Sequence, residues 1–375
     1  MRRKAFGAVA AAVAAALTGL AAPASAETPA EILQAAAQTG VSLGYPGVIG
    51  LVRNGEAAQY IHAGYGNLTA KTPADPKARF RIGSDTKAFT AAVLLQLEAE
   101  GKLSLDDPLA RWLPGSVNAN GNDGTKITVR QVLNQTSGLP DYAADARFIN
   151  SYVANTNPRQ AWPPQTLVDI ATSHPSLGAP GAAFHYSNTN YILAGMVIKA
   201  VTGNEPAAEI QRRVFEPLSL TNTSFPTADP SLTGNYLTGY YIWLGVFYND
   251  VTVSNVQAFG TAGAIVSTED DLATFERALL SGKLLPPRQQ AELKTTVPAD
   301  NAGTRYGLGI GLSPTPCGLA WNHSGGVLGY FNLWLTSDDG SKQVLVAANE
   351  NHLAGVATRG QTTLGNAAFK AYCAS

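Results

Sequence analysis

A serine and a lysine stand three residues apart in Ser84-Asp85-Thr86-Lys87, at the start of a segment with helical periodicity. Residues i and i+3 share one face of a helix, so the Lys87 ammonium can reach the Ser84 hydroxyl. A serine becomes a nucleophile when an adjacent base takes its proton, and a desolvated lysine can be that base. Lys87 is the only lysine with a serine three positions earlier. The alternative is an N-cap serine followed by a surface lysine one turn on.

A second candidate group contains two side chains that could assist acyl transfer to a serine. Tyr186 and Asn188 stand in a loop before the apolar run 192–200. A tyrosine whose pKa is lowered by a nearby ammonium could relay protons, and Asn188 could hold a substrate amide. The same spacing recurs at residues 65–67 and 330–332, which adjoin predicted strands. Spacing alone therefore does not select Tyr186, and a structural role is the alternative for each tripeptide.

The third group is His323-Ser324-Gly325-Gly326, which enters a predicted strand. Small residues let a substrate backbone lie close to a strand edge, and an amide there can supply an oxyanion donor opposite the Ser84 N–H. A Gly-rich turn with a packing or surface histidine is the alternative. The G-x-S-x-G pattern at residues 40–44 is set aside, because a nucleophile elbow needs a strand before its serine and a helix after it. Here the order is reversed.

The first 26 residues have the pattern of a secretory signal peptide, with basic residues at positions 2–4, an alanine-rich core and a small-residue end at Ala26. Without them the chain carries 23 basic and 27 acidic residues, a formal charge of −4. No basic stripe suggests a nucleic acid partner. No later stretch is apolar enough to span a bilayer, so we expect a secreted, extracellular or periplasmic protein without a membrane span.

The chain has two cysteines, Cys317 and Cys373. In an exported protein one disulfide between them is favoured, and two buried thiols are the alternative. No Cys-x-x-Cys or histidine pair stands nearby, so a zinc site is not indicated. We expect no metal and no cofactor.

The elements that must position these groups begin with a capping box at residues 28–31, which opens a helix ending at Gly40. Two strand-like runs follow at residues 48–52 and 58–62. The helix that carries Ser84 then stops at Gly101.

The rest of the chain is first helical and then strand-rich. Short helices separated by Pro, Gly and Asn fill the middle, and the late pattern predicts strands at 306–312, 331–337 and 343–349 and a helix at 355–372. We expect an α/β protein whose antiparallel sheet is built from both termini and flanked by helices. The predicted domains are a sheet domain at 27–100 and 257–375 and an inserted, mostly helical domain at 101–256.

With these groups in this order, the chain resembles the penicillin-recognising serine hydrolases. The likeness is closest to the secreted D-alanyl-D-alanine carboxypeptidases and the class C β-lactamase-like proteins, and it includes segments 127–133, 136–142 and 262–272. The Cys317-Gly318 step and Cys373 also look like the disulfide pair of the secreted carboxypeptidases. The resemblance implies a β-lactamase/transpeptidase-like fold.

The resemblance also implies catalytic roles. Ser84 would be acylated, Lys87 and Tyr186 would handle protons, and Asn188 would bind the substrate amide. Which group is the base for acylation is disputed in such enzymes.

On the strand, the resemblance implies substrate binding by His323, Ser324 and Gly325, with His323 where related enzymes carry lysine. The backbone N–H groups of Ser84 and Gly326 would form the oxyanion hole.

The chain departs from the carboxypeptidase pattern at the groups that bind the terminal carboxylate of the substrate. The segment 309–314 contains no arginine, and Gly326 stands where those enzymes have a threonine. A missing guanidinium removes the bidentate partner of a carboxylate. Arg305 is near in sequence.

We therefore expect a Ser84 acyl-enzyme acting on a small peptide, ester or β-lactam substrate, peptidoglycan stem peptides included. A penicillin-reactive D-alanyl-D-alanine carboxypeptidase is the first hypothesis. An esterase, a D-amino-acid amidase or aminopeptidase, or a β-lactamase would use the same site. A non-catalytic penicillin-binding or cell-wall-binding module is the third possibility, and it would not need an activated nucleophile.

Overall fold

The computed structural model describes residues 27–243, 247–351 and 359–375. Within them the central element is a nine-stranded sheet in the order β3-β2-β1-β13-β12-β11-β10-β9-β8. Its neighbouring strands pair antiparallel. The strands are β1 (Gly47–Asn54), β2 (Ala57–Asn67), β3 (Thr72–Pro73), β8 (Val297–Pro298), β9 (Arg305–Tyr306), β10 (Gly311–Thr315), β11 (Gly318–Val327), β12 (Tyr330–Thr336) and β13 (Lys342–Ala348). Two short pairs lie outside it, β4 (Phe80–Arg81) with β7 (Val266–Ser267) and β5 (Tyr240–Trp243) with β6 (Phe247–Asp250).

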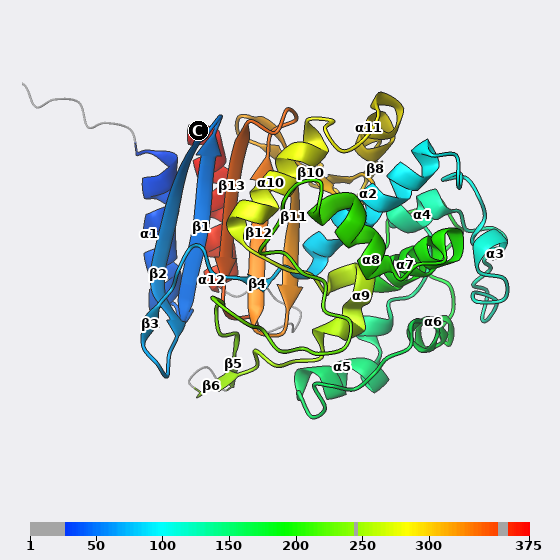
Figure 1. The fold of residues 1–375 in the computed structure, drawn as a ribbon, viewed down its shortest axis with the longest axis horizontal. Coiled ribbons are helices and arrows are strands. Elements are labelled where there is room, and N and C mark those ends of the chain that lie inside the picture. The colour runs from blue at the N-terminus through cyan, green and yellow to red at the C-terminus, as the bar shows by residue number, and fades with distance from the viewer. Residues whose placement is uncertain (1–26, 244–246, 352–358) are drawn as a thin grey trace, which may run out of the picture.

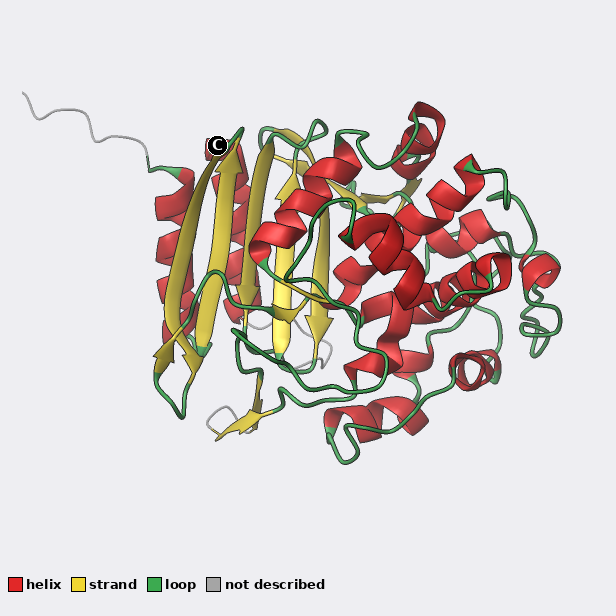
Figure 2. Cartoon of the chain, in the orientation of Figure 1, coloured by secondary structure: helices red, strands yellow, loops and turns green. Residues whose placement is uncertain are grey.

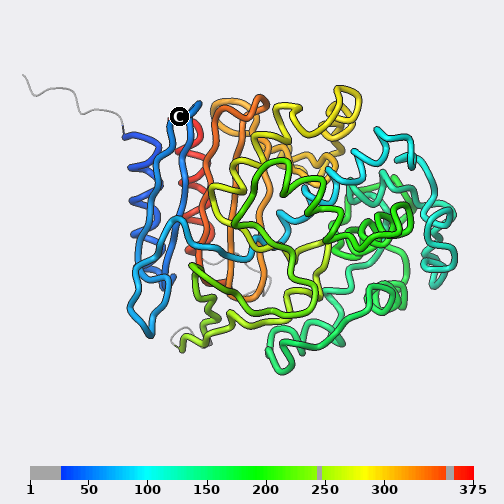
Figure 3. Tube along the Cα trace, viewed as in Figure 1, coloured from blue at the N-terminus to red at the C-terminus, as the bar shows by residue number. Residues whose placement is uncertain are grey.

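The two ends of the chain meet in this sheet, as the sequence predicted. Strand β1 pairs with β13 in a register that sets Val48 opposite Ala348. In Figure 3 the blue and red ends of the tube run side by side. A sheet closed by both termini brings residues about 300 positions apart into one core, which is why local periodicity could suggest it but not fix its register.

Helices cover both faces of the sheet (Figure 1). Helices α1 (Pro29–Ser42) and α12 (Arg359–Ala374) pack on one face, where Val48 and Val52 of β1 join their core. The alternate residues Ile49 and Leu51 join the larger core on the other face. Strand β1 is thus apolar on both sides, as expected for a strand buried between two layers.

The larger core includes the helices that gather beyond the sheet in Figure 2. They are α2 (Thr86–Ala99), α3 (Leu109–Trp112), α4 (Val129–Leu133), α5 (Ala146–Val153), α6 (Pro164–Thr172), α7 (Asn188–Thr202), α8 (Pro206–Ile210), α9 (Gly260–Gly263), α10 (Glu269–Leu280) and α11 (Pro287–Lys294). Single turns of other helix types are η1 (Gly83–Asp85), η2 (Tyr142–Ala144), η3 (Gln211–Phe215) and η4 (Val256–Phe259). Between α2 and η4 most of the regular elements are helices, joined by long loops and turns, and the strand pair β5–β6 also lies there. Domain boundaries at 100 and 257 stay a prediction.

Local sequence patterns predicted some elements correctly and one wrongly. The Thr28/Glu31 capping box at the start of α1 is confirmed. The single strand predicted at 306–312 is wrong, because β9 and β10 are separate there. Gly309 between them has φ +82°, and a Cβ on it would lie 2.8 Å from the Lys87 carbonyl oxygen. The break lets this loop pass close over α2.

Cys317, in the turn before β11, is joined by a disulfide to Cys373 of α12, with the two Cα atoms 5.5 Å apart. No helix in the described ranges has the length and hydropathy to cross a membrane. The predicted signal peptide lies outside the described residues, so export stays a prediction. Residues 40–44 fall at the end of α1 and before β1, the order that argued against a nucleophile elbow.

Candidate active site

Ser84 lies in the single turn η1, which leads directly into helix α2. Residues 86–95 of α2 are all buried, as expected of a helix that is apolar nearly all round and sits in the core. The turn is therefore anchored to a fixed element. The Lys87 Nζ lies 3.0 Å from the Ser84 Oγ, so the predicted pair is formed.

The hydrogen bonds of Lys87 fix the direction of its amine. Besides the Ser84 contact, Nζ donates to the Asn188 Oδ1 at 2.9 Å and to the Ala262 carbonyl oxygen at 2.8 Å. Those two oxygens can only accept, so they take two N–H groups of the amine. In the neutral amine, the remaining position that faces Ser84 is a lone pair. The arrangement points a proton acceptor at the serine hydroxyl.

Because Lys87 is buried, its amine can lose its proton near neutral pH. Lys87 is fully buried, and loss of hydration lowers its pKa from 10.5 to about 7. The negative charges of Asp141 and Asp85 act in the opposite direction. A lysine with this pKa can accept a proton near pH 7 and return it.

Tyr186 lies beside this pair, with the Lys87 Nζ 4.9 Å from the centre of its ring. The expectation of a lowered pKa is wrong. Although 39% of the residue surface stays exposed, desolvation of the phenol raises the pKa of Tyr186, and its hydrogen-bonding contact with Ser84 opposes the rise only in part. Tyr186 is therefore a neutral phenol at neutral pH, suited to donate a proton rather than to take one.

Asn188, the first residue of α7, joins Lys87 to a carboxyl group that the sequence did not single out as a site residue. Its Nδ2 donates to Asp141 Oδ2 at 3.0 Å while its Oδ1 accepts from Lys87. Burial raises the pKa of Asp141, and hydrogen bonds from Ala143 and Asn188 and the charge of Lys87 act against that rise. Both ends of the Asn188 amide are thus held by protein groups, which fixes its orientation.

His323 on β11 is buried, and both of its ring nitrogens face protein groups. Nδ1 lies 2.8 Å from the Ser324 carbonyl oxygen and 3.5 Å from Asp85 Oδ1. Nε2 lies 3.0 Å from the Tyr306 hydroxyl. Tyr306 was not predicted as a site residue, because nothing in its local sequence indicates a histidine partner. Its ring also stands 6.4 Å, centre to centre, from that of Tyr186.

Glycines bring β11 against the nucleophile turn. A Cβ on Gly83, which has φ +53°, would lie 2.8 Å from the Gly326 amide nitrogen, and one on Gly325 would lie 1.9 Å from the Ile82 carbonyl oxygen. Asn332 on β12 bridges β11 and the turn. Its side chain accepts from the Gly325 N–H and donates to the Ile82 carbonyl oxygen, each at 3.1 Å. The backbone amide of Gly326 therefore lies close to the turn that carries Ser84.

The two other Tyr-x-Asn tripeptides lie outside the cluster around Lys87. Tyr330 is fully buried and its hydroxyl donates to the Leu237 carbonyl oxygen. Tyr65 lies on β2. Their asparagines make structural contacts, Asn332 with the nucleophile turn and Asn67 with Thr238.

The groups around Gly326 differ from a carboxylate-binding pair. A Cβ on Gly326 would lie 2.9 Å from the Asn351 Nδ2. The side-chain amide of Asn351 therefore fills the space that a side chain at position 326 would need. The guanidinium of Arg305 donates to the Thr296 hydroxyl at 2.7 Å and to the Thr296 carbonyl at 2.9 Å. Arg305 is therefore already engaged with its own neighbourhood.

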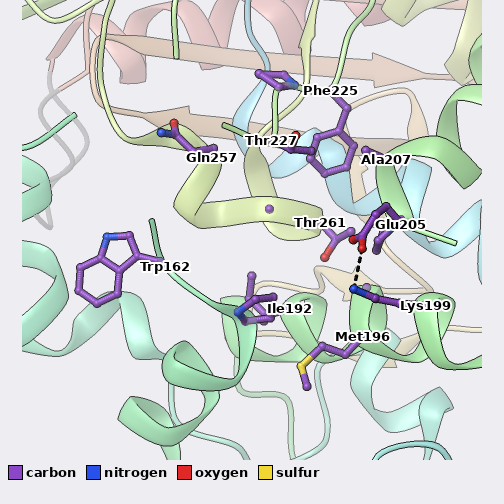
Figure 4. A pocket seen from close by; sticks show the side chains of 15 residues that line it. Trp162, Ile192, Met196, Lys199, Glu205, Ala207, Phe225, Thr227, Gln257 and Thr261 are labelled. Atoms are coloured by element: carbon purple, nitrogen blue, oxygen red, sulfur yellow. Dashed lines mark hydrogen bonds and ion pairs between the residues drawn. The ribbon is translucent and has the colours of Figure 1, made fainter. Parts of the chain in front are cut away.

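A separate apolar pocket of about 280 Å³ lies between α7, α8 and α9 (Figure 4). Trp162, Ile192, Met196 and Phe225 line it, and the Lys199–Glu205 ion pair stands among its lining residues. Ser84, Lys87 and Tyr186 do not line this pocket. We assign the chemistry to the hydrogen-bonded cluster at Ser84 because the nucleophile and its base lie there.

The described ranges contain no group of three or more His, Cys, Asp or Glu side chains arranged to hold a metal ion.

Comparison with known proteins identifies relatives over most of the chain. Residues 30–367 match the Beta-lactamase family. Penicillin-binding protein 4* of Bacillus subtilis is 27% identical over 323 residues, which are 82% of this chain and 68% of that protein. Protein flp of Staphylococcus aureus (strain MRSA252) is 36% identical over 178 residues, and the match spans only 34% of its length.

Two solved structures cover nearly the same extent. A D-stereospecific amidohydrolase from Streptomyces sp. superposes with a TM-score of 0.84 at 36% identity, covering 91% of this chain and 98% of that one. The D-amino acid amidase of Ochrobactrum anthropi SV3 superposes with a TM-score of 0.78 at 25% identity, covering 92% and 98%. With its β-lactamase-like fold, the chain belongs to the Beta-lactamase family of serine hydrolases, together with the penicillin-binding protein homologues.

Proposed function

We propose that the protein hydrolyses amide bonds of D-amino-acid derivatives through an acyl-enzyme at Ser84. The observation that carries the chemistry is the buried Lys87, whose Nζ lies 3.0 Å from the Ser84 Oγ while the Asn188 Oδ1 and the Ala262 carbonyl oxygen accept from it. The substrate class is supported by the likeness to the Streptomyces D-stereospecific amidohydrolase over 98% of that chain.

Acylation begins when the neutral Lys87 amine takes the Ser84 proton and the Oγ attacks the carbonyl carbon of the substrate. The carbonyl oxygen becomes an oxyanion, and the backbone N–H groups of Ser84 and Gly326 stabilise it. When the tetrahedral intermediate collapses, the C–N bond breaks and the leaving nitrogen must gain a proton. In this proposal the neutral Tyr186 phenol donates it, and the Lys87 ammonium then reprotonates Tyr186.

Deacylation repeats these steps with water as the nucleophile. Lys87, neutral again, takes a proton from a water molecule that attacks the acyl carbon. Ser84 leaves with a proton, and the acid product departs. Asn188 holds the lysine in place throughout, because its amide is fixed between Lys87 and Asp141.

The neighbourhood of Gly326 favours amides over peptides with a free C-terminus. A terminal carboxylate is best bound by an arginine fork or by hydroxyl donors, whereas the groups near Gly326 include the neutral Asn351 amide. A D-amino-acid amide or N-terminal D-residue does not require such a partner.

A penicillin-reactive D-alanyl-D-alanine carboxypeptidase is the second candidate. Its specific support is the match to a penicillin-binding protein over 82% of this chain. Esterase and β-lactamase activities would use the same acyl-enzyme and would differ in how quickly it hydrolyses.

The test compares four substrates on one enzyme preparation: D-phenylalanine amide, L-phenylalanine amide, a D-Ala-D-Ala peptide with a free carboxylate, and a short p-nitrophenyl ester. Release from the D-amide that exceeds release from the L-amide and from the peptide supports the proposal. Greater release of D-alanine from the peptide supports the carboxypeptidase instead.

Intact-mass analysis with a penicillin separates the mechanism from the substrate class. A covalent adduct present in the wild type and absent from Ser84→Ala supports acylation of Ser84. If no β-lactam and no activated ester labels the folded protein, the acyl-enzyme proposal is wrong. Rapid loss of the adduct with consumption of the drug indicates a β-lactamase.

A further inference from the structure

A polar side chain stands in the middle of the apolar strand β12. Asn332 is 2% exposed, and its neighbours on the same face of the strand are Tyr330 and Trp334, which belong to the larger core. A strand buried on both faces is usually a continuous apolar run, so an apolar residue would be expected between them. A buried amide is costly unless its hydrogen bonds are satisfied. The mechanism above gives Asn332 no role.

The hydrogen bonds of Asn332 join strand β11 to the turn that carries the nucleophile. Its Oδ1 accepts from the Gly325 N–H and its Nδ2 donates to the Ile82 carbonyl oxygen, each at 3.1 Å. Gly325 directly precedes Gly326, and Ile82 is the N-cap of η1, two residues before Ser84. Each end of the amide thus holds the backbone within two residues of a proposed oxyanion donor.

Gly325 leaves the space that this side chain needs. The two residues stand opposite each other in the register of β11 and β12. A Cβ on Gly325 would lie 2.6 Å from the Asn332 Nδ2 and 2.8 Å from its Oδ1, so a larger residue would collide with the amide. The glycine provides the space and the asparagine provides the hydrogen bonds.

The amide takes the place of a direct backbone link. In the described part of the chain, no backbone hydrogen bond joins residues 82–85 to residues 323–327. Strand β10 pairs with β11 as far as Asn322, and beyond it the partner strand is β12. A Cβ on Gly83 would lie 2.8 Å from the Gly326 nitrogen, so the two backbones are already as close as they can come. Packing therefore sets the minimum separation, and Asn332 opposes a larger one.

Replacing the amide would release both backbone groups. With an apolar side chain at position 332, the Gly325 N–H would lose its acceptor. The Ile82 carbonyl oxygen would keep the Asp85 N–H, at 3.3 Å. Buried backbone groups are unfavourable without partners, so the end of β11 should move until its N–H is satisfied. Such a movement changes the position of Gly326 relative to Ser84.

We propose that Asn332 is a positioning residue for the oxyanion hole, because its amide fixes the separation between the Ser84 N–H and the Gly326 N–H. The inference rests on the acyl transfer and the oxyanion hole proposed above, and it adds the side chain that sets their geometry. Two donors stabilise an oxyanion fully only when both lie at hydrogen-bonding distance from it. Loss of Asn332 should weaken that stabilisation and leave the contact between Ser84 and Lys87 in place.

The test uses the acyl-enzyme formed with an activated ester of an arylacrylic acid and measures its carbonyl stretch by isotope-edited infrared spectroscopy. Donors in an oxyanion hole polarise this carbonyl, so its frequency in the wild type should lie below that of the free ester. Asn332→Leu should raise the frequency toward that of the free ester. Deacylation should slow by about tenfold to about a hundredfold, the upper value being that for a donor removed outright.

Asn349→Leu is the matched control. Asn349 is also fully buried and also bridges two backbone groups, since it accepts from the Gly47 N–H at 2.7 Å and donates to the Thr238 carbonyl oxygen at 2.9 Å. Neither partner belongs to η1 or β11. This variant should lose stability in urea unfolding while its carbonyl frequency and deacylation rate stay those of the wild type. An equal rise of the frequency in both variants would overturn the proposal.

The possible failures are distinguishable. A folded Asn332→Leu with the frequency and deacylation rate of the wild type overturns the role of Asn332 and leaves the proposed function standing. If that variant does not fold, Asn332→Ser replaces it, because the shorter side chain cannot reach both backbone groups, and the same rise is expected. A wild-type frequency equal to that of the free ester overturns the oxyanion hole. Failure of the ester and of a fluorophosphonate to label the wild type overturns the proposed function itself.

Discussion

At the scale of single residues, the protonation of Lys87 governs the acylation rate. Only the neutral amine can take the Ser84 proton, and burial sets the pKa of Lys87 at about 7. Below that pH the acylation rate should fall about tenfold for each pH unit, and above it the rate should level off. Single-turnover acylation by an activated D-phenylalanine ester measures this. A rate independent of pH across the neutral range would show that Lys87 is not the base.

The same burial predicts that Lys87 costs stability. In the folded protein its pKa is about 7, and the ordinary value is 10.5. Between these values the unfolded chain binds one more proton than the folded one, so this group makes the free energy of unfolding rise with pH, by about 5 kcal/mol at most. Lys87→Met should lack that rise. Urea unfolding of both proteins at neutral and alkaline pH measures the difference, and equal dependence on pH in the two would contradict the prediction.

Residues with unusual chemistry could be named from the sequence, and their partners could not. The Ser84–Lys87 spacing is local, so one turn of helix suffices to predict the contact. Asp141 lies in segment 136–142, which the resemblance includes, but neither its contact with Asn188 nor that of Tyr306 with His323 can be predicted from local sequence. Burial also reversed the predicted direction of the Tyr186 pKa shift, since the degree of desolvation is a tertiary property.

At the scale of elements, the close approach of β11 to η1 is what assembles the site. A Cβ on Gly325 would lie 1.9 Å from the Ile82 carbonyl oxygen, and backbone cannot yield cheaply. Gly325→Ala should therefore displace the strand, lower kcat by about a hundredfold or more through the misplaced oxyanion donor and reduce stability. Steady-state kinetics and thermal unfolding measure the two effects.

Gly365→Ala is the control for that variant. Gly365 lies in α12, and a Cβ on it would meet nothing within 4 Å. Alanine is preferred to glycine inside a helix by about 1 kcal/mol, so this variant should be as stable as the wild type or slightly more so, with unchanged kinetics. Equal loss of activity in both glycine variants would show that the contact at Gly325 is not special.

Elements with strong local signals were predicted well, and those shaped by tertiary contacts were not. The capping box located the start of α1, and apolar runs located β1, β12 and β13. The break between β9 and β10 was missed because the apolar run 306–312 resembles a single strand. Its cause is the passage of Gly309 over the Lys87 backbone, a contact between segments more than 200 residues apart in sequence.

At the scale of the whole molecule, the two ends of the chain hold each other in place. Helices α1 and α12 share one core on the face of the sheet away from α2. The Cys317–Cys373 disulfide fixes the last helix to the turn before β11, across a sequence separation of 56 residues. Ser84 and Lys87 belong to the layer on the other face of the sheet. We therefore expect that the disulfide can be removed without changing the chemistry.

Reduction of the disulfide should therefore lower stability without changing the chemistry. A closed loop of this length restricts the unfolded chain and stabilises the fold by about 4 kcal/mol on the chain-entropy account. Dithiothreitol should lower the urea midpoint of the wild type, and Cys317→Ser/Cys373→Ser should unfold at that lower midpoint with or without the reductant. Because Ser84, Lys87 and Tyr186 contact neither cysteine, the acylation rate of the folded double variant should stay within about twofold of the wild type, as expected for sites that share no partner. An unchanged midpoint after complete reduction would show that the packing of α12 alone closes the molecule.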